Sequence, residues 1–169
     1  MFLKRLFARS EDTAQSLYEA IVAAARRPFF YAEWAVPDTI DGRFDMISLH
    51  LFLVLERLRG EGAEVEDFRQ RLTDTFFADM DRSLREMGVG DLSVGKKVRK
   101  MSEAFYGRVK AYAEALQQGS GLTEALARNV YAGVAEAEAT RLADWVLKAR
   151  EHLKAQATEE IVRGKVAFP

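Results

Sequence analysis

The chain has 169 residues, with 25 basic and 26 acidic side chains, 49% apolar residues and three prolines. This length and apolar content predict one globular domain with its own core, and exclude a chain that is disordered throughout. A formal net charge of −1 excludes binding of nucleic acid over the whole surface, so any such contact must be local. The chain has no cysteine, which excludes disulfides, thiolate zinc sites, thiol nucleophiles and c-type haem attachment.

The first nine residues, MFLKRLFAR, form a short basic amphipathic pattern. Such a pattern is typical of a segment that touches an anionic membrane surface, although one amphipathic turn binds bilayers weakly. The alternative is an N-terminus that simply docks on the protein. The longest apolar run, residues 46–55, is far shorter than the roughly 20 residues of a membrane-spanning helix, so we expect no spanning segment.

The next two segments are predicted to be a helix and a connector. Ser10 is a typical N-cap, and apolar residues at helical spacing follow it, which predicts a helix over residues 10–26. Pro28 ends that helix. Residues 26–43 are predicted to form an aromatic connector that closes with a turn at residues 41–42. Because this connector is long for a loop, we expect its aromatic rings to pack it against the protein.

Three longer helices are predicted in the middle of the chain. Residues 44–59 are apolar on almost every side, which is typical of a central helix. Residues 65–87 repeat large apolar side chains at intervals of three and four, and Gly88 is the expected C-cap. Asp91 or Ser93 opens the next helix, which has a regular apolar stripe and ends near residue 118.

The C-terminal part is predicted to hold two further helices. Thr123 is the expected cap of a short helix that runs to Tyr131. A last helix carries an apolar stripe through Ile161, before Gly164 and a frayed tail over residues 162–169. No segment alternates with period two. The sequence therefore predicts an all-α single domain over residues 1–169, an irregular bundle of about six helices.

A match to a nucleotide-binding motif occurs at residues 90–96, GDLSVGK. These residues fit the first seven positions of the phosphate-binding loop pattern G-x-x-x-x-G-K-[ST]. Lys97 occupies the eighth position, where a hydroxyl has to hold the magnesium ion, and a helix precedes the loop where the motif requires a strand. We therefore do not expect nucleotide hydrolysis.

Metal and acid–base chemistry have equally weak support. A di-iron site in a helical bundle needs Glu-x-x-His pairs, and neither His50 nor His152 has a glutamate three residues before it. We expect His50 to be a hydrogen-bonded core histidine. Asp79 and Asp81 diverge on a helix and are better explained by pairing with neighbouring arginines. The sequence predicts no cofactor, no metal and no catalytic residue.

A cluster of cations, here called the basic patch, consists of Lys96, Lys97, Arg99 and Lys100. It crowds the first turns of a predicted helix, where the helix dipole favours acidic residues. The basic patch is therefore a candidate contact for RNA phosphate, a lipid headgroup or an acidic partner. In the alternative, acidic neighbours neutralise the patch within the protein; they are Asp79, Asp81, Glu86 and Asp91.

Several segments together resemble the ubiquinol-cytochrome c chaperone family. They are WAVPDT (34–39), GRFDM (42–46), LH (49–50), FADMDRSLREMGVGDL (77–92), VGKK (94–97) and FYGR (105–108). The likeness covers roughly residues 14–118, and the block from residue 79 to residue 97 is its most specific part. The resemblance implies an assembly factor for the cytochrome bc1 complex. Mitochondrial members bind newly made cytochrome b with a small partner protein and associate with ribosomes near the tunnel exit.

The resemblance also implies where such a protein acts. A mitochondrial member is expected to carry a longer targeting extension than this chain has. We therefore expect a bacterial-type homologue that acts in the cytoplasm, with peripheral contact at the inner membrane. Its expected partners are cytochrome b, the ribosome and an anionic membrane surface, and no DNA.

An apolar client surface is expected in the middle of the chain. A chaperone without enzymatic activity or ATP use would shield cytochrome b through methionine and aromatic side chains, which are polarizable and repack easily. The candidates, here called the predicted groove, are Trp34, Phe44, Met46, Phe76, Phe77, Met80, Met87, Met101 and Phe105. Taken singly, each is better explained as core, because a stripe at helical spacing is first of all packing. The alternative function is an RNA- or ribosome-binding helical module that uses the basic patch.

Overall fold

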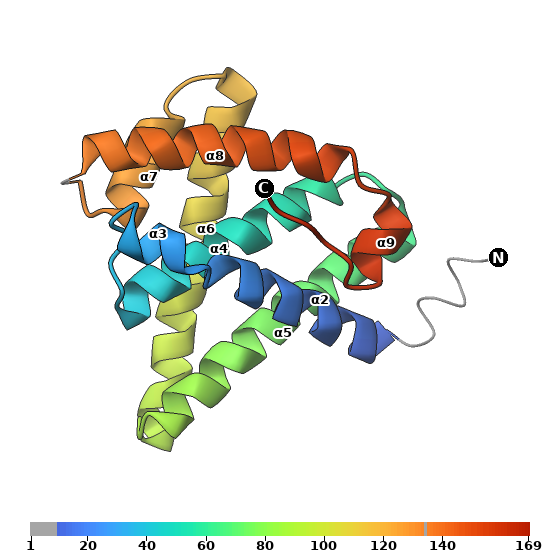
Figure 1. Cartoon of the computed structure of the whole chain (residues 1–169). Coiled ribbons are helices and arrows are strands. Elements are labelled where there is room, and N and C mark those ends of the chain that lie inside the picture. The colour runs from blue at the N-terminus through green and yellow to red at the C-terminus, as the bar shows by residue number, and fades with distance from the viewer. Residues whose placement is uncertain (1–9, 134) are drawn as a thin grey trace.

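The computed structural model describes residues 10–133 and 135–169, with side chains from residue 13 onward, and the regular structure in these ranges is entirely helical. The helices in chain order are α2 (Ser10–Ala25), α3 (Pro28–Ala32), α4 (Ile40–Arg57), α5 (Ala63–Glu86), α6 (Asp91–Gln118), α7 (Leu122–Val130), α8 (Glu136–Lys154) and α9 (Thr158–Val162) (Figure 1). The predicted all-α fold is confirmed. The amphipathic pattern predicted at residues 1–9 lies outside the described residues.

Helix α4 is the centre of the bundle. It packs against α2, α6, α7 and α8, and residues 44–55 are all buried. This confirms the prediction that the helix apolar on almost every side is central, since such a helix can bury every face only when others surround it. In the part of the chain that the structure describes, no helix combines the length and the apolarity needed to cross a bilayer.

Helices α5 and α6 form a hairpin whose corner projects away from the rest of the bundle (Figure 1). Gly88 follows the last turn of α5 with φ +82°, a left-handed conformation that glycine adopts without strain. The backbone N–H of Val89 donates to the carbonyl of Leu84 at 3.0 Å, which closes the helix end. The C-cap itself is Met87, so the predicted cap at Gly88 is off by one residue, although Gly88 does end the helix.

The start of α4 differs from the predicted turn at residues 41–42. The side chain of Thr39 caps the helix by accepting a hydrogen bond from the backbone N–H of Gly42 at 3.1 Å, so α4 begins at Ile40. A Cβ atom added at Gly42 would lie 1.9 Å from the carbonyl oxygen of Pro37. The glycine is therefore needed inside the first helical turn, where the preceding loop folds back on the helix.

The predicted connector and the predicted cap of α7 also need correction. The connector contains a helix of its own, α3, which starts at Pro28 because proline is well suited to the first turn of a helix. Helix α7 begins at Leu122, with Gly121 as its N-cap in a left-handed conformation. Thr123 therefore lies inside the helix and is not its cap.

The predicted last helix is broken, and its tail is not frayed. Arg57 donates to the carbonyls of Leu153 and Gln156, which lie at the break between α8 and α9. The ring of Phe168 is buried, with its centroid 4.9 Å from that of His50. Burial of this ring and a hydrogen bond of 2.6 Å from Arg27 to the carbonyl of Pro169 fix the tail on the core.

Candidate functional site

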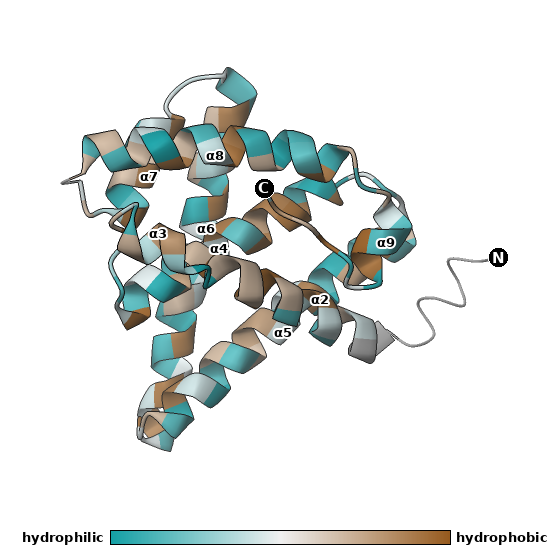
Figure 2. Cartoon of the chain, viewed as in Figure 1, coloured by the Kyte–Doolittle hydropathy of each residue, from teal (hydrophilic) through white to brown (hydrophobic). Residues whose placement is uncertain are grey.

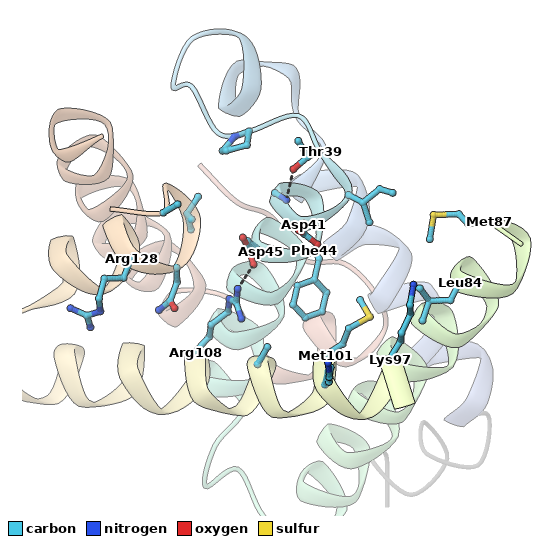
Figure 3. A pocket seen from close by; sticks show the side chains of 18 of the residues that line it. Thr39, Asp41, Phe44, Asp45, Leu84, Met87, Lys97, Met101, Arg108 and Arg128 are labelled. Atoms are coloured by element: carbon cyan, nitrogen blue, oxygen red, sulfur yellow. Dashed lines mark hydrogen bonds and ion pairs between the residues drawn. The ribbon is translucent and has the colours of Figure 1, made fainter. Parts of the chain in front are cut away.

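A cleft of about 1010 Å³ lies between the start of α4 and residues 97–108 of α6 (Figure 3). The corner between α5 and α6 closes one end, and the last turn of α7 lies at the other. We call it the α4–α6 cleft. Its apolar and charged groups occupy different parts of the wall.

The apolar part of the cleft lies next to the α5–α6 corner. Ile40 is 62% exposed and Met87 is 48% exposed, although both side chains are large and apolar. Phe44 and Met101 line the cleft between them, from α4 and α6 respectively (Figure 3). Ile40 and Met87 keep this apolar wall open to solvent, while Phe44 is buried at its base, and an exposed apolar wall is a common feature of protein interaction sites.

A buried ion pair crosses the cleft from α4 to α6. Arg108 forms an ion pair with Asp45 at 2.7 Å, and both side chains are largely buried. The guanidinium carbon of Arg108 lies 5.6 Å from the ring centroid of Phe44, in a cation–π arrangement. Burial raises the pKa of Asp45 to about 6, because the loss of solvent outweighs the opposing effect of Arg108. The ion pair therefore links the two walls of the cleft.

Exposed cations lie along the rim of the cleft. Lys97 and Lys100 come from α6, and Arg128 comes from α7. None of the three forms an ion pair with an acidic residue in the ranges that the structure describes. Their charges are therefore available to a partner with negative charge.

The acidic residues expected to neutralise the basic patch are mostly engaged elsewhere. Asp79 pairs with Arg82 and accepts a hydrogen bond from Tyr18 at 2.7 Å. Asp81 and Asp91 both pair with Arg85. Within the basic patch, Arg99 pairs with Glu103 at 3.2 Å on its own helix. The pairing predicted for Asp79 and Asp81 with neighbouring arginines is confirmed. Among the described residues, no ion pair joins the basic patch to Asp79, Asp81, Glu86 or Asp91.

The structure divides the predicted groove into three sets. Phe44, Met87 and Met101 line the α4–α6 cleft. Met46, Phe76 and Phe105 have no exposed surface, so the structure assigns them to core packing and excludes them as client contacts in this conformation. The remaining members lie outside the cleft; they are Trp34, Phe77 and Met80. Binding of a client by the first set stays a prediction.

The three members outside the cleft also pack against the core. Trp34 is half-buried, with its ring centroid 5.0 Å from that of Phe29. Phe77 packs edge-on against Phe105 at 5.8 Å, and Met80 is buried on the same helix. Each therefore has a structural role, which helical spacing could not separate from a role in binding.

His50 has the environment predicted for a core histidine. It has no exposed surface, and its Nδ1 lies 2.7 Å from the carbonyl oxygen of Met46. Burial lowers the pKa of His50 to about 4, so the ring is neutral at physiological pH. Among the described residues, no group of three or more His, Asp or Glu side chains is arranged to hold a metal ion.

Comparisons with known proteins agree with the resemblance found in the sequence. The profile of the family described as Ubiquinol-cytochrome C chaperone matches residues 32–168. Ubiquinol-cytochrome-c reductase complex assembly factor 1 of Xenopus laevis is 25% identical over 103 residues, which cover 61% of this chain and 52% of that protein. The corresponding factor of Homo sapiens is 24% identical over 159 residues, which cover 92% of this chain and 53% of that protein. The chain thus spans about half the length of these relatives.

A solved structure supports the same assignment over the whole chain. The crystal structure of the Cbp3 homolog from Brucella abortus superposes with a TM-score of 0.85 at 40% sequence identity, and covers 100% of this chain and 97% of that one. The family match and this likeness both extend well beyond the segments that first indicated the relationship. The chain belongs to the ubiquinol-cytochrome c chaperone family.

Proposed function

We propose that the chain is an assembly chaperone of the cytochrome bc1 complex that holds newly synthesised cytochrome b in the α4–α6 cleft. The observation that carries this proposal is the exposure of Ile40 and Met87 beside a cleft of about 1010 Å³. Two relatives, from Xenopus laevis and Homo sapiens, are named as assembly factors of ubiquinol-cytochrome c reductase, which supports the choice of client.

The chemistry of the cleft suits such a client. A membrane protein exposes apolar helices before it is inserted, and the wall formed by Ile40, Met87 and Met101 offers them an apolar contact. Methionine side chains are flexible, so the contact adapts to helices of different sequence. Lys97, Lys100 and Arg128 then contact negative groups at the polar end of the client helix.

This function requires binding and release but no catalytic step, cofactor or metal. In this proposal the protein acts in the cytoplasm at the inner face of the membrane, where its client is made and inserted. The ribosome is a second expected partner, because holding has to begin while cytochrome b is being synthesised.

The experiment is a pull-down of the chain from its native cells during synthesis of respiratory complexes, washed at moderate salt and analysed by mass spectrometry. The double variant Ile40→Glu/Met87→Glu places two charges in the apolar wall, and we expect it to lose cytochrome b. The matched control is Leu147→Glu on α8, because Leu147 is 48% exposed, like Met87, and lies outside the cleft. Equal recovery by both variants would contradict the cleft as the binding site.

The second candidate is the RNA- or ribosome-binding function. It is favoured by the exposure of Lys96, Lys97 and Lys100, which form no ion pair within the described part of the chain. Contacts to phosphate weaken steeply as salt rises, whereas apolar contacts tolerate salt. Recovery of ribosomal RNA and proteins alone, lost at high salt and lost in the triple lysine-to-glutamine variant, would favour this function over the first.

A further inference from the structure

The corner between α5 and α6 ends in an apolar tip. Leu92 in the first turn of α6 is fully exposed, at 100% of its reference surface, and Met87 at the end of α5 is 48% exposed. Figure 2 shows apolar residues beside polar ones at this projecting corner. A single exposed leucine is ordinary on a protein surface, so by itself it does not indicate a binding site. The charged residues around the tip are the second observation.

The basic patch lies on α6 directly behind the tip. Lys96 lies about 6 Å along the helix axis from Leu92 and Lys100 about 12 Å, at 1.5 Å per residue. Because successive helical residues turn by 100°, the four cations lie within an arc of about 160° on one half of α6, and Leu92 falls within the same arc. All four are exposed. The tip therefore projects beyond a positively charged half of α6.

The negative charges near the tip are fewer than the positive ones. Residues 85–100 contain five basic and two acidic residues, and the acidic residues are Glu86 and Asp91. Asp91 pairs with Arg85, and Glu103 one turn further along α6 pairs with Arg99. Lys96 forms no ion pair with a described residue and lies outside the α4–α6 cleft. Residues 85–100 therefore carry a net positive charge.

We propose that this corner docks on an anionic lipid surface, with Leu92 entering the apolar boundary and Lys96 and Arg99 contacting the headgroups. The apolar side chain extends beyond the cations, and this arrangement favours a lipid surface over RNA. An RNA phosphate backbone offers no apolar layer for a leucine to enter. In a bilayer the acyl chains lie directly beneath a layer of negative headgroups. Leu92 and Lys96 are not part of the cleft wall, so this surface leaves the cleft free for a client.

Flotation with lipid vesicles tests the proposal. The purified chain is mixed either with vesicles of phosphatidylcholine alone or with vesicles that also contain phosphatidylglycerol, and the bound fraction is measured at two salt concentrations. We expect binding only to the anionic vesicles. Leu92→Ser is expected to weaken it about tenfold, from the loss of one buried leucine, and Lys96→Gln about fivefold. The matched controls on α8, Leu147→Ser and Lys148→Gln, should bind like the unchanged chain.

A second measurement locates the tip. Because the chain has no cysteine, Leu92→Cys introduces a single thiol for a polarity-sensitive dye, and Leu147→Cys serves as the control position. Only the dye at position 92 should report an apolar environment when anionic vesicles are added. The proposal is overturned by absence of vesicle binding, by binding that survives Leu92→Ser and Lys96→Gln, or by a dye that stays in water. Cytochrome b capture should be unchanged in Leu92→Ser, which separates this surface from the cleft.

Discussion

Two regions along α4 show how one helix supports both a closed core and an open cleft. Around His50, rings from three other segments converge: Phe30 from α3, Trp145 from α8 and Phe168 from the C-terminal tail, at centroid distances of 5.4, 5.0 and 4.9 Å. Around Phe44, six residues earlier, Phe76 of α5 and Arg108 of α6 pack on the ring, which is buried at the base of a cleft that opens toward Ile40 and Met87.

The difference between the two regions lies in what covers them and not in the residues of α4 itself. Both regions have aromatic neighbours, but α3 and the tail reach only the His50 end. The Phe44 end is bounded by an ion pair, Asp45 to Arg108, which spans the two walls without filling the space between them. We conclude that the cleft exists because no element of the described chain covers Ile40 in the first turn of α4.

The largest effect is expected from a truncation in the closed region. Phe30 has no exposed surface and contacts the rings of Trp34, His50 and Trp145, so Phe30→Ala should lower the free energy of unfolding by about 3–5 kcal/mol. In the open region, Met87→Ala should change it by less than about 0.5 kcal/mol. Urea unfolding of both variants gives the comparison. Similar losses would show that the corner is packed by something that the fold does not explain.

The next effect separates the two regions by pH. The buried ring of His50 has its pKa lowered to about 4, so the folded state resists protonation that the unfolded state accepts below about 6.5. Stability is full above that pH and falls as the pH drops toward 4, by about 3 kcal/mol. Asp45 in the cleft acts in the opposite direction, since its pKa is raised to about 6 and protonation there favours folding.

The variant His50→Gln isolates the histidine, because Asp45 contributes equally to both proteins. We expect the difference in free energy of unfolding between the two proteins to shift by about 3 kcal/mol between pH 7 and pH 4, with the unchanged chain losing more stability. Urea unfolding at four or five pH values measures this shift. A constant difference across that range would mean that the ring already carries its proton, or is hydrated, in the folded state.

The sequence predicted the helices well because periodicity and turn residues are local signals. It misplaced the start of α4, since the Asp41–Gly42 pair is a common turn signal. In the structure Thr39 is the N-cap, and its side chain accepts a hydrogen bond from the backbone N–H of Gly42. It also missed the break between α8 and α9. There the chain is held by Arg57, about a hundred residues away in sequence, and no local pattern contains that contact.

The site was harder to predict for a related reason. Met46 and Met101 both fall in apolar stripes at helical spacing, yet one is core and the other lines the cleft. Which of them is covered depends on where neighbouring helices end, and helical periodicity holds no information on that. Ile40 was missed altogether, although its position after Thr39 at a helix start could have suggested an exposed apolar side chain.

An intermediate effect is expected where the loop before α4 closes on the cleft. In Gly42→Ala the new Cβ would overlap the carbonyl oxygen of Pro37, so the loop has to shift, at a cost of about 1–3 kcal/mol. Because Ile40 and Phe44 flank this position, the shift should also weaken capture of cytochrome b. Thermal unfolding and the pull-down together measure both effects. Normal stability and normal capture would show that the loop moves freely and does not define the cleft.

The smallest effect has the opposite sign and tests the open side of α6. Gly107 is exposed within this helix, and a Cβ placed there meets no atom within 4 Å among the described residues. Gly107→Ala should therefore raise the free energy of unfolding by about 0.5–1 kcal/mol, because alanine favours the helix and loses less backbone entropy on folding. A loss of stability would mean that this face of α6 is covered.

The same variant tests whether α6 has to bend for the cleft to bind its client. If the wall formed by α6 binds its client as a rigid surface, Gly107→Ala should capture cytochrome b as well as the unchanged chain does. If α6 bends at Gly107 to admit helices of different width, the more stable variant should capture less, and its loss should be greatest for the bulkiest client segments. Capture per folded molecule distinguishes the two, because the effect on stability is already known from the unfolding measurement.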